Sequence, residues 1–188
     1  MKQKVKFSAY SLIVTAVVLI LCVVGIFSLI GNAEKLTLFC IIMGGATIVG
    51  LYYCPKSIQA DESSVTLHRL LSSPKVFNYN SIQAVDTCYP SAGGLRLCGS
   101  GGFFGYWGYF SDIMIGAYFG YYGSRSNCIL LKMKEGKQYV LGCNNAAEMV
   151  AYIKQQMNKL ASFRAHHIVH NFEQPTSMLW TFLFTPTT

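Results

Sequence analysis

FSAYSLIVTAVVLILCVVGIFSLI, from Phe7 to Ile30, is a run of 24 residues without a charge, and LTLFCIIMGGATIVGLYY, from Leu36 to Tyr53, is a second run of 18. A helix rises about 1.5 Å per residue, so about 20 residues cross a hydrocarbon core roughly 30 Å thick. The five residues between the runs are too few to cross back. We therefore expect residues 1–55 to form a transmembrane helical hairpin, with spans at about 7–30 and 36–53.

The basic residues that flank these runs predict their orientation. Three lysines, Lys2, Lys4 and Lys6, precede the first run, and Lys56 follows the second. Because short cytoplasmic segments carry an excess of Lys and Arg, both the N-terminus and the C-terminal domain are expected to be cytosolic, in a multi-pass protein of the inner membrane. A cleaved signal peptide is disfavoured, since its apolar core would be shorter and no second span would follow.

Small residues on the second apolar run allow close helix packing. Ala46 and Gly50 lie four positions apart, a spacing that lets two helix backbones approach each other. They either pack the two helices of one hairpin together or form a contact between subunits. Neither run contains a charged residue inside it, so no proton or ion pathway is expected.

After the hairpin, about 130 residues remain, enough for one small domain, which we place at 56–163. The net charge of the chain is +7, and its seven cysteines show no CxxC spacing, which favours free thiols over a disulfide framework. His166, His167 and His170 cluster in the tail at 164–188, but no further ligand follows at a suitable spacing, so no metal site is expected.

Short alternating segments separated by turns fill the first part of this domain, a pattern that predicts an antiparallel sandwich or partial barrel. Residues 128–134 and 138–143, joined by a tight turn, form the clearest hairpin. Apolar positions at helical spacing then predict an amphipathic helix from Ala146 to about Phe163, which would cover the β structure.

Glycine and aromatic residues alternate irregularly between Leu95 and Tyr122. We expect a long hairpin with glycine bends and an aromatic tip, whose rings either fill the core or lie against lipid headgroups, where Trp and Tyr are favoured. The glycine spacing does not match a phosphate-binding loop. His68 has no evident catalytic partner, Ser100 is not in a nucleophile elbow, and acids such as Asp112 fall at strand ends expected to be solvated. Neither an enzyme nor a cofactor is therefore expected.

The order of a helical hairpin, about seven strands and one amphipathic helix is that of a pleckstrin-homology (PH)-like domain. Residues 95–106 (LRLCGSGGFFGY), the hairpin at 128–143 and the helix from Ala146 resemble the bacterial PH domains of small membrane-anchored proteins. The resemblance implies a membrane-anchored α+β fold, with a PH-like antiparallel sandwich or partial barrel and a C-terminal capping helix. Eukaryotic relatives bind phosphoinositides through paired basic residues in the first hairpin, but His68-Arg69 here lacks that pattern.

These observations predict a membrane-anchored cytosolic PH-like module that acts as a protein-interaction or self-assembly scaffold at the inner membrane. The alternative is an anionic-lipid-sensing domain at the membrane surface. The expected partners are the lipid bilayer and either a second copy of the chain or another membrane protein, and no nucleic acid, metal or cofactor is expected. The residues predicted to contact the membrane surface or a partner are Lys56, Arg69, Lys75, Phe103, Phe104, Tyr106 and Trp107.

Overall fold

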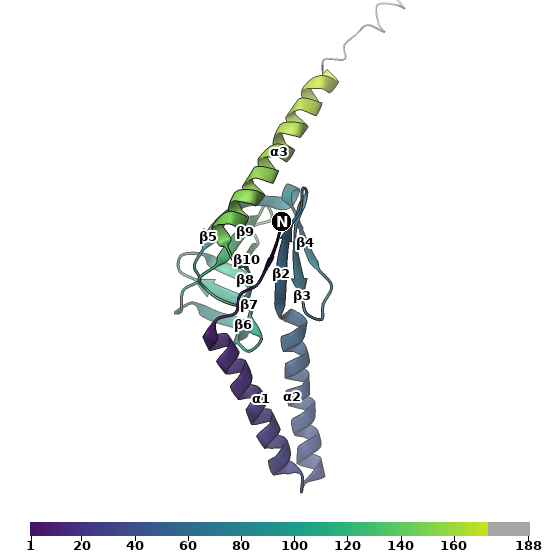
Figure 1. The fold of residues 1–188 in the computed structure, drawn as a ribbon, viewed down its shortest axis with the longest axis vertical. Coiled ribbons are helices and arrows are strands. Elements are labelled where there is room, and N and C mark those ends of the chain that lie inside the picture. Colours follow the sequence, from purple (N-terminus) through teal and green to yellow (C-terminus); the bar gives the residue numbers. More distant parts are fainter. Residues whose placement is uncertain (173–188) are drawn as a thin grey trace, which may run out of the picture.

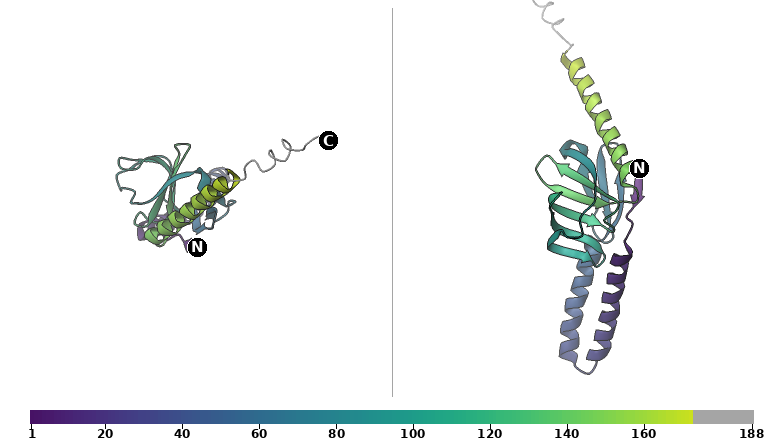
Figure 2. Two further views of the ribbon diagram at one scale, coloured as in Figure 1. Left: turned by 90° about the horizontal axis from the view of Figure 1, so that it is seen from above. Right: turned by 90° about the vertical axis from the view of Figure 1, so that its left-hand side faces the viewer.

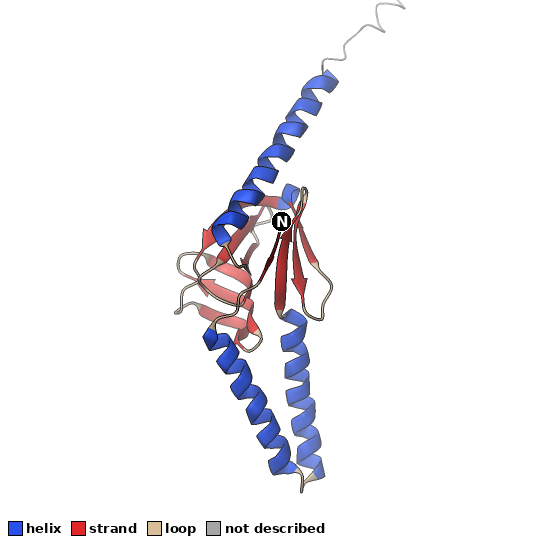
Figure 3. Cartoon of the chain, in the orientation of Figure 1, coloured by secondary structure: helices blue, strands red, loops and turns tan. Residues whose placement is uncertain are grey.

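The computed structural model describes residues 1–172, with side chains as far as residue 164. Three parts follow one another along the long axis of the molecule: a hairpin of two helices, a β domain, and a C-terminal helix that points away from the hairpin (Figure 1). The strands lie together between the helical parts (Figure 3). The predicted α+β fold with a PH-like arrangement of strands and a C-terminal helix is confirmed.

The helical hairpin consists of α1 (Ala9–Leu29) and α2 (Ala33–Tyr53), which lie side by side in two perpendicular views (Figures 1 and 2). Side-chain oxygens of Ser8 and Asn32 cap their N-termini, so each helix begins directly after a residue that satisfies a free backbone amide. Because Asn32 starts α2, that helix begins before the apolar run predicted from residue 36. Both helices are long and apolar enough to cross a membrane, judged by length and composition.

Small residues in this hairpin serve two different contacts. A Cβ atom at Gly25 would lie 2.5 Å from the ring of Phe39, so this glycine lets α1 and α2 approach each other. Gly50 instead faces the β domain, where a Cβ would lie 2.8 Å from the ring of Phe104. Ala46 is exposed. Gly50 therefore serves neither of the two predicted helix contacts but packs against the domain.

Segments from both sides of the helical hairpin build the first sheet. β1 (Lys2–Lys4) precedes α1 and pairs antiparallel with β2 (Pro55–Ala60), which follows α2. β3 (Ser64–Arg69) and β4 (Lys75–Asn78) extend the sheet in the order β1-β2-β3-β4. The sequence predicted only a basic flank before the first helix. Instead, Lys2 and Lys4 lie in an edge strand, and the two helices are connected to adjacent strands of one sheet.

The second sheet has the order β5-β9-β10-β8-β7-β6 and is antiparallel except for the parallel pair β8 and β10. A short 3₁₀ turn, η1 (Tyr79–Ser81), leads into it. Its strands are β5 (Ile82–Cys88), β6 (Leu95–Gly102), β7 (Gly105–Asp112), β8 (Gly116–Tyr122), β9 (Cys128–Met133) and β10 (Gln138–Gly142).

The glycine-rich stretch forms the three strands β6, β7 and β8, with two turns, rather than the single long hairpin predicted. Gly99 and Gly108 lie opposite each other in β6 and β7, and both have positive φ. A Cβ on either would collide with a carbonyl oxygen of the facing strand, that of Trp107 or Cys98. Glycine is required there because the two backbones approach too closely for a side chain.

The main core lies between the two sheets and beneath α3 (Ala146–Phe172). Met149 and Ile153 on α3 are fully buried among the apolar side chains of both sheets, such as Ile58 and Leu131. Burying side chains of this size stabilises the fold by about 1.5–3 kcal/mol each. Helix α3 continues past the predicted end near Phe163 and extends beyond the domain (Figure 1).

Candidate functional site

The turn between β6 and β7 packs against both helices of the hairpin. The Ser11 hydroxyl donates a hydrogen bond to the carbonyl oxygen of Gly102 at 2.8 Å, and the Phe104 amide donates to Thr15 Oγ1 at 3.0 Å. The rings of Phe103 and Phe104 lie over Gly50 of α2. Phe104 has φ of 54°, which costs a non-glycine residue about 1–2 kcal/mol, so the contacts with the helices hold a strained turn.

Aromatic residues next to this turn continue the contact with α2. The indole ring of Trp107 stacks on Tyr53 at the end of α2, with ring centroids 5.0 Å apart, and its Nε1 donates to the carbonyl oxygen of Phe103 at 3.2 Å. Tyr106 is only 4% exposed and stacks on Tyr122 inside the domain. Of the four aromatic residues predicted to form a contact surface, Tyr106 therefore lies in the core, and the other three pack against the hairpin.

The structure brings two of the three predicted basic residues together. The Lys75 ammonium lies 4.2 Å from the centroid of the Tyr139 ring, and the Arg69 guanidinium lies 5.5 Å from that of Tyr52. Burial, followed by the positive charges of Arg69 and Lys137, lowers the pKa of Lys75. The side chain of Lys56 is exposed on β2.

Between Arg69 and Lys75 lies a loop with two exposed leucines. Leu70 is 46% exposed and Leu71 is 61% exposed. The amide of Leu70 donates to the carbonyl oxygen of Cys54, which holds the loop beside the end of α2. This apolar pair between two basic residues was not among the contact residues predicted from the sequence.

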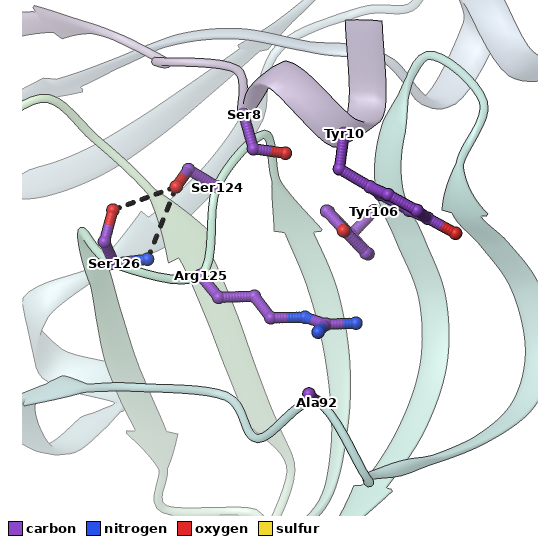
Figure 4. A pocket seen from close by; sticks show the side chains of 7 residues that line it. All are labelled: Ser8, Tyr10, Ala92, Tyr106, Ser124, Arg125 and Ser126. Atoms are coloured by element: carbon purple, nitrogen blue, oxygen red, sulfur yellow. Dashed lines mark hydrogen bonds between the residues drawn. The ribbon is translucent and has the colours of Figure 1, made fainter. Parts of the chain in front are cut away.

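A second feature missed from the sequence is a hollow of about 530 Å³ beside the start of α1 (Figure 4). Arg125 reaches into it from the loop between β8 and β9, with Ser8 and Tyr10 on the helix side. The amide of Ser8 donates to the carbonyl oxygen of Gly123, which fixes that loop to the helix. Arg125 was not predicted as a site residue, because only the fold places it next to the N-terminus of α1.

The described residues contain no group of three His, Cys, Asp or Glu side chains able to hold a metal ion. Burial raises the pKa of the Cys88 thiol to about 12 and that of Cys143 to about 11, so both thiols stay protonated and are poor nucleophiles. The side chains of the histidine cluster at 166–170 lie outside the described part.

Asp112 differs from the solvated acid that was predicted. It is buried, and its carboxylate accepts hydrogen bonds from the amides of Ser91 and Met114 at 2.8 and 2.9 Å. The hydrogen bonding to Ser91, above all, lowers the pKa of this carboxyl group. Asp112 therefore stabilises the turns at the end of β7.

Residues 56–157 match the family model of the bacterial PH domain. No curated protein and no solved structure matches the chain. PH-like domains are in general protein- or lipid-interaction modules and typically lack catalytic activity. The match covers more than half of the chain and takes in the first sheet apart from β1, the whole second sheet and most of the packed part of α3. The chain therefore belongs to the bacterial PH domain family.

Proposed function

We propose that this protein is a membrane-anchored PH-like interaction module, held by its hairpin against the cytosolic face of the inner membrane, where it binds a protein partner or a second copy of itself. The docking of the β6–β7 turn on α1 and α2 is the observation that supports this most directly. It joins the domain to the hairpin by contacts beyond the chain connections. A domain held in this way keeps one face toward the bilayer and presents the other surfaces in a fixed orientation.

The composition of α1 and α2 supports the anchor, since both pass the length and hydropathy requirements of a span. Their apolar side chains are largely exposed, as expected for helices whose surroundings are lipid. Lys4 and Lys6 flank α1, and Lys56 flanks α2, on the side of the β domain. By the positive-inside rule, this side is cytosolic.

The free edge of β6 is the surface that best suits a protein partner. Among the described residues, β6 pairs only with β7, so one row of its backbone groups has no strand partner there. Leu95 and Leu97 on this strand are 70% and 64% exposed. An exposed edge with apolar side chains is a template for adding another strand, from a second copy or from a different protein.

The native Cys98 gives a direct test, because this exposed thiol also lies on β6. Membranes containing the full-length chain are treated with a short bismaleimide, and the products are identified by mass spectrometry. We expect wild type to give a crosslinked dimer or a crosslinked partner. This product should be lost in Cys98→Ser and kept in Cys88→Ser, the matched control at a buried cysteine. If wild type gives only monomer, without any crosslinked product, β6 is not the interaction surface.

Contact with anionic lipid is the second candidate, favoured by the loop between β3 and β4. Leu70 and Leu71 are exposed beside the end of α2, with Arg69 and Lys75 on either side. Apolar side chains of this kind enter the interface, and each basic group near an anionic surface adds about 1 kcal/mol. To reach the phosphates of the lipid headgroups, the side chains of Arg69 and Lys75 would lose part of their contacts with aromatic rings.

An environment-sensitive fluorophore on Leu71→Cys, in a Cys98→Ser background, tests this second candidate. Full-length protein is placed in nanodiscs of phosphatidylcholine alone or with phosphatidylglycerol. A blue shift that grows with phosphatidylglycerol supports anionic-lipid contact. The same label on Lys137→Cys, in the exposed turn between β9 and β10, should not respond. Equal spectra at both positions would exclude the lipid role of this loop.

A further inference from the structure

The hollow beside α1 combines features of an anion-binding site. Its lining comes from four separate parts of the chain: the start of α1, the loop before β6, Tyr106 on β7, and the loop between β8 and β9. An adjoining hollow of about 380 Å³ shares Tyr106 and Arg125 and adds Arg96. No Asp or Glu lines either hollow. The two spaces together therefore expose two guanidinium groups to a common region without a carboxylate among the lining residues.

The positively charged side chain of Arg125 has few interaction partners within the protein. Its Nε is buried and has no hydrogen-bond partner, and among the described residues the side chain forms no salt bridge. Its guanidinium carbon lies 4.9 Å from the centroid of the Tyr106 ring, a contact that orients the group and leaves its N–H donors directed elsewhere. A planar guanidinium with unused donors is suited to bind the oxygens of a phosphate.

The nearest acid does not neutralise this region. Asp112 lies near Gly94, which lines the adjoining hollow, but both of its carboxylate oxygens accept backbone hydrogen bonds. These bonds leave the carboxylate charged, but among the described residues it forms no salt bridge with Arg96 or Arg125. Neither guanidinium therefore has a carboxylate partner there, and both remain available to a ligand.

Hydroxyl groups next to Arg125 and the N-terminus of α1 add further donors around the hollow. Ser124 and Ser126 face each other with their hydroxyl oxygens 2.9 Å apart, and Ser8 caps α1. The first turn of α1 carries no acidic residue, and the first amides of a helix have no partner within it. The start of α1, with Ser8 and Tyr10, and the side chain of Arg125 lie around one space (Figure 4).

What distinguishes this hollow from a site for a free anion is the apolar surface that continues from it. Tyr10, which lines it, is 59% exposed, and Leu12 and Ile13 on the next positions of α1 are 58% and 61% exposed. If α1 spans the membrane, these side chains face acyl chains while the hollow lies at the depth of the headgroups. We infer that this site binds the phosphate group of an anionic phospholipid, with the acyl chains along α1 and Arg125 as the main phosphate ligand.

The inference rests on the membrane anchoring proposed above but not on the binding of a protein partner, and its site is distinct from the loop at Leu70 and Leu71. The experiment uses full-length protein in phosphatidylcholine nanodiscs that contain a minor fraction of phosphatidylglycerol. The protein is released from the nanodiscs in the mass spectrometer, and native mass spectrometry identifies the lipid that stays bound. We expect one phosphatidylglycerol to stay bound to wild type. Arg125→Gln should lower the retained fraction about tenfold, the effect of losing about 1.4 kcal/mol of binding free energy.

Controls separate this site from general attraction by positive charge. Lys137→Gln removes the same charge from an exposed turn between β9 and β10 and should retain lipid as wild type does. Arg125→Lys keeps the charge but loses the planar fork, so its retention should lie between those of wild type and Arg125→Gln. Thermal unfolding of each variant establishes that the domain is folded, and Ser124→Ala provides a milder change on the same wall of the hollow.

Competition with inorganic phosphate and with glycerol phosphate distinguishes the source of the phosphate. If neither soluble compound displaces the bound phosphatidylglycerol, the result supports a lipid site. Displacement by either at millimolar concentration would overturn the lipid assignment and indicate a site for a soluble phosphate. Equal retention by wild type and a folded Arg125→Gln, or no retention by wild type, would overturn the site itself. Failure of the Cys98 crosslinking experiment would leave these results unaffected.

Discussion

The hydroxyl of Ser11 in α1 donates a hydrogen bond to the carbonyl oxygen of Gly102, 91 positions further along the chain, at 2.8 Å. Ser11 is fully buried, although it lies in a helix whose other side chains are mostly exposed. Its polar group is thus satisfied by the β domain, as is that of Thr15 one turn later. The start of α1 is therefore built for contact with the domain rather than with lipid alone.

Replacing Thr15 with valine should loosen this contact. Thr15→Val keeps the shape of the side chain but removes the oxygen that accepts the Phe104 amide, and an unpaired buried amide costs about 1–3 kcal/mol. Hydrogen exchange of residues 101–106 in nanodiscs should become faster. Thr37→Val is the control. The hydroxyl that it removes donates to the Ala33 carbonyl oxygen of the same helix, so hydrogen exchange of residues 101–106 should not change. Equal exchange in all three proteins would contradict the docking.

A side chain at Gly50 should separate the domain from α2. In Gly50→Leu the new atoms collide with the rings of Phe103 and Phe104, and overpacking of this kind costs about 1–3 kcal/mol. Limited proteolysis should then cut the β6–β7 turn. Gly45→Leu is the matched control, because a Cβ at Gly45 meets nothing within 4 Å. Equal resistance of both variants to the protease would show that Phe103 and Phe104 do not rest on α2.

The sequence was sufficient to predict the helical hairpin, the hairpin of β9 and β10, and the start of α3 at Ala146, because each has a local signal: long uncharged runs, strand alternation across a tight turn, and apolar residues at helical spacing. It was not sufficient for β1. Lys2–Lys4 has no apolar face, and it becomes a strand only because β2 offers it an edge, a contact between residues far apart in the chain. Local propensity carries no information about such a pairing.

The candidate surfaces were predicted incompletely for a similar reason. The rings of Phe103 and Trp107 were recognised as distinctive, but their contacts with Gly50 and Tyr53 depend on how the domain folds back on the hairpin. Arg125 lies in an ordinary turn sequence, and nothing nearby in the chain indicates a phosphate site. Its position next to Ser8 arises from the hydrogen bond between Ser8 and Gly123.

The buried carboxylate of Asp112 should give the domain a pH-dependent stability. Hydrogen bonds lower its folded pKa below 3.8, so its stabilisation is complete above pH 3.8 and is lost as pH falls through the lower folded value. Asp112→Asn should lower the free energy of unfolding by about 1–3 kcal/mol at neutral pH and by less in acid. Urea unfolding, followed by tryptophan fluorescence at both pH values, measures this difference.

Asp86→Asn is the control for that prediction. Asp86 pairs with Lys154 at 3.0 Å, but both side chains are more than half exposed, so the loss should be below about 1 kcal/mol. A penalty for Asp112→Asn that is no larger than that of Asp86→Asn, or that stays constant from neutral to acid pH, would contradict the role assigned to Asp112.

Thiol reactivity should report both the anchoring and the orientation of the chain. Cys98 is exposed on β6, whereas Cys88, Cys128 and Cys143 are buried with raised pKa values. Because the thiolate is the reactive form, a charged maleimide should modify Cys98 rapidly and the buried thiols slowly. Cys40 is exposed on α2 and should also be protected, provided that lipid surrounds that helix.

Two comparisons make this result decisive. In nanodiscs, Cys98→Ser should abolish rapid labelling and Cys40→Ser should leave it intact, while equally fast labelling at Cys40 would mean that water reaches α2 and that the hairpin is not a membrane anchor. In cells, the charged reagent should modify Cys98 only after permeabilisation if the β domain has the cytosolic orientation that we propose from the positive-inside rule. Labelling of Cys98 in intact cells would place the β domain, and the phosphate site at Arg125, on the opposite side of the membrane.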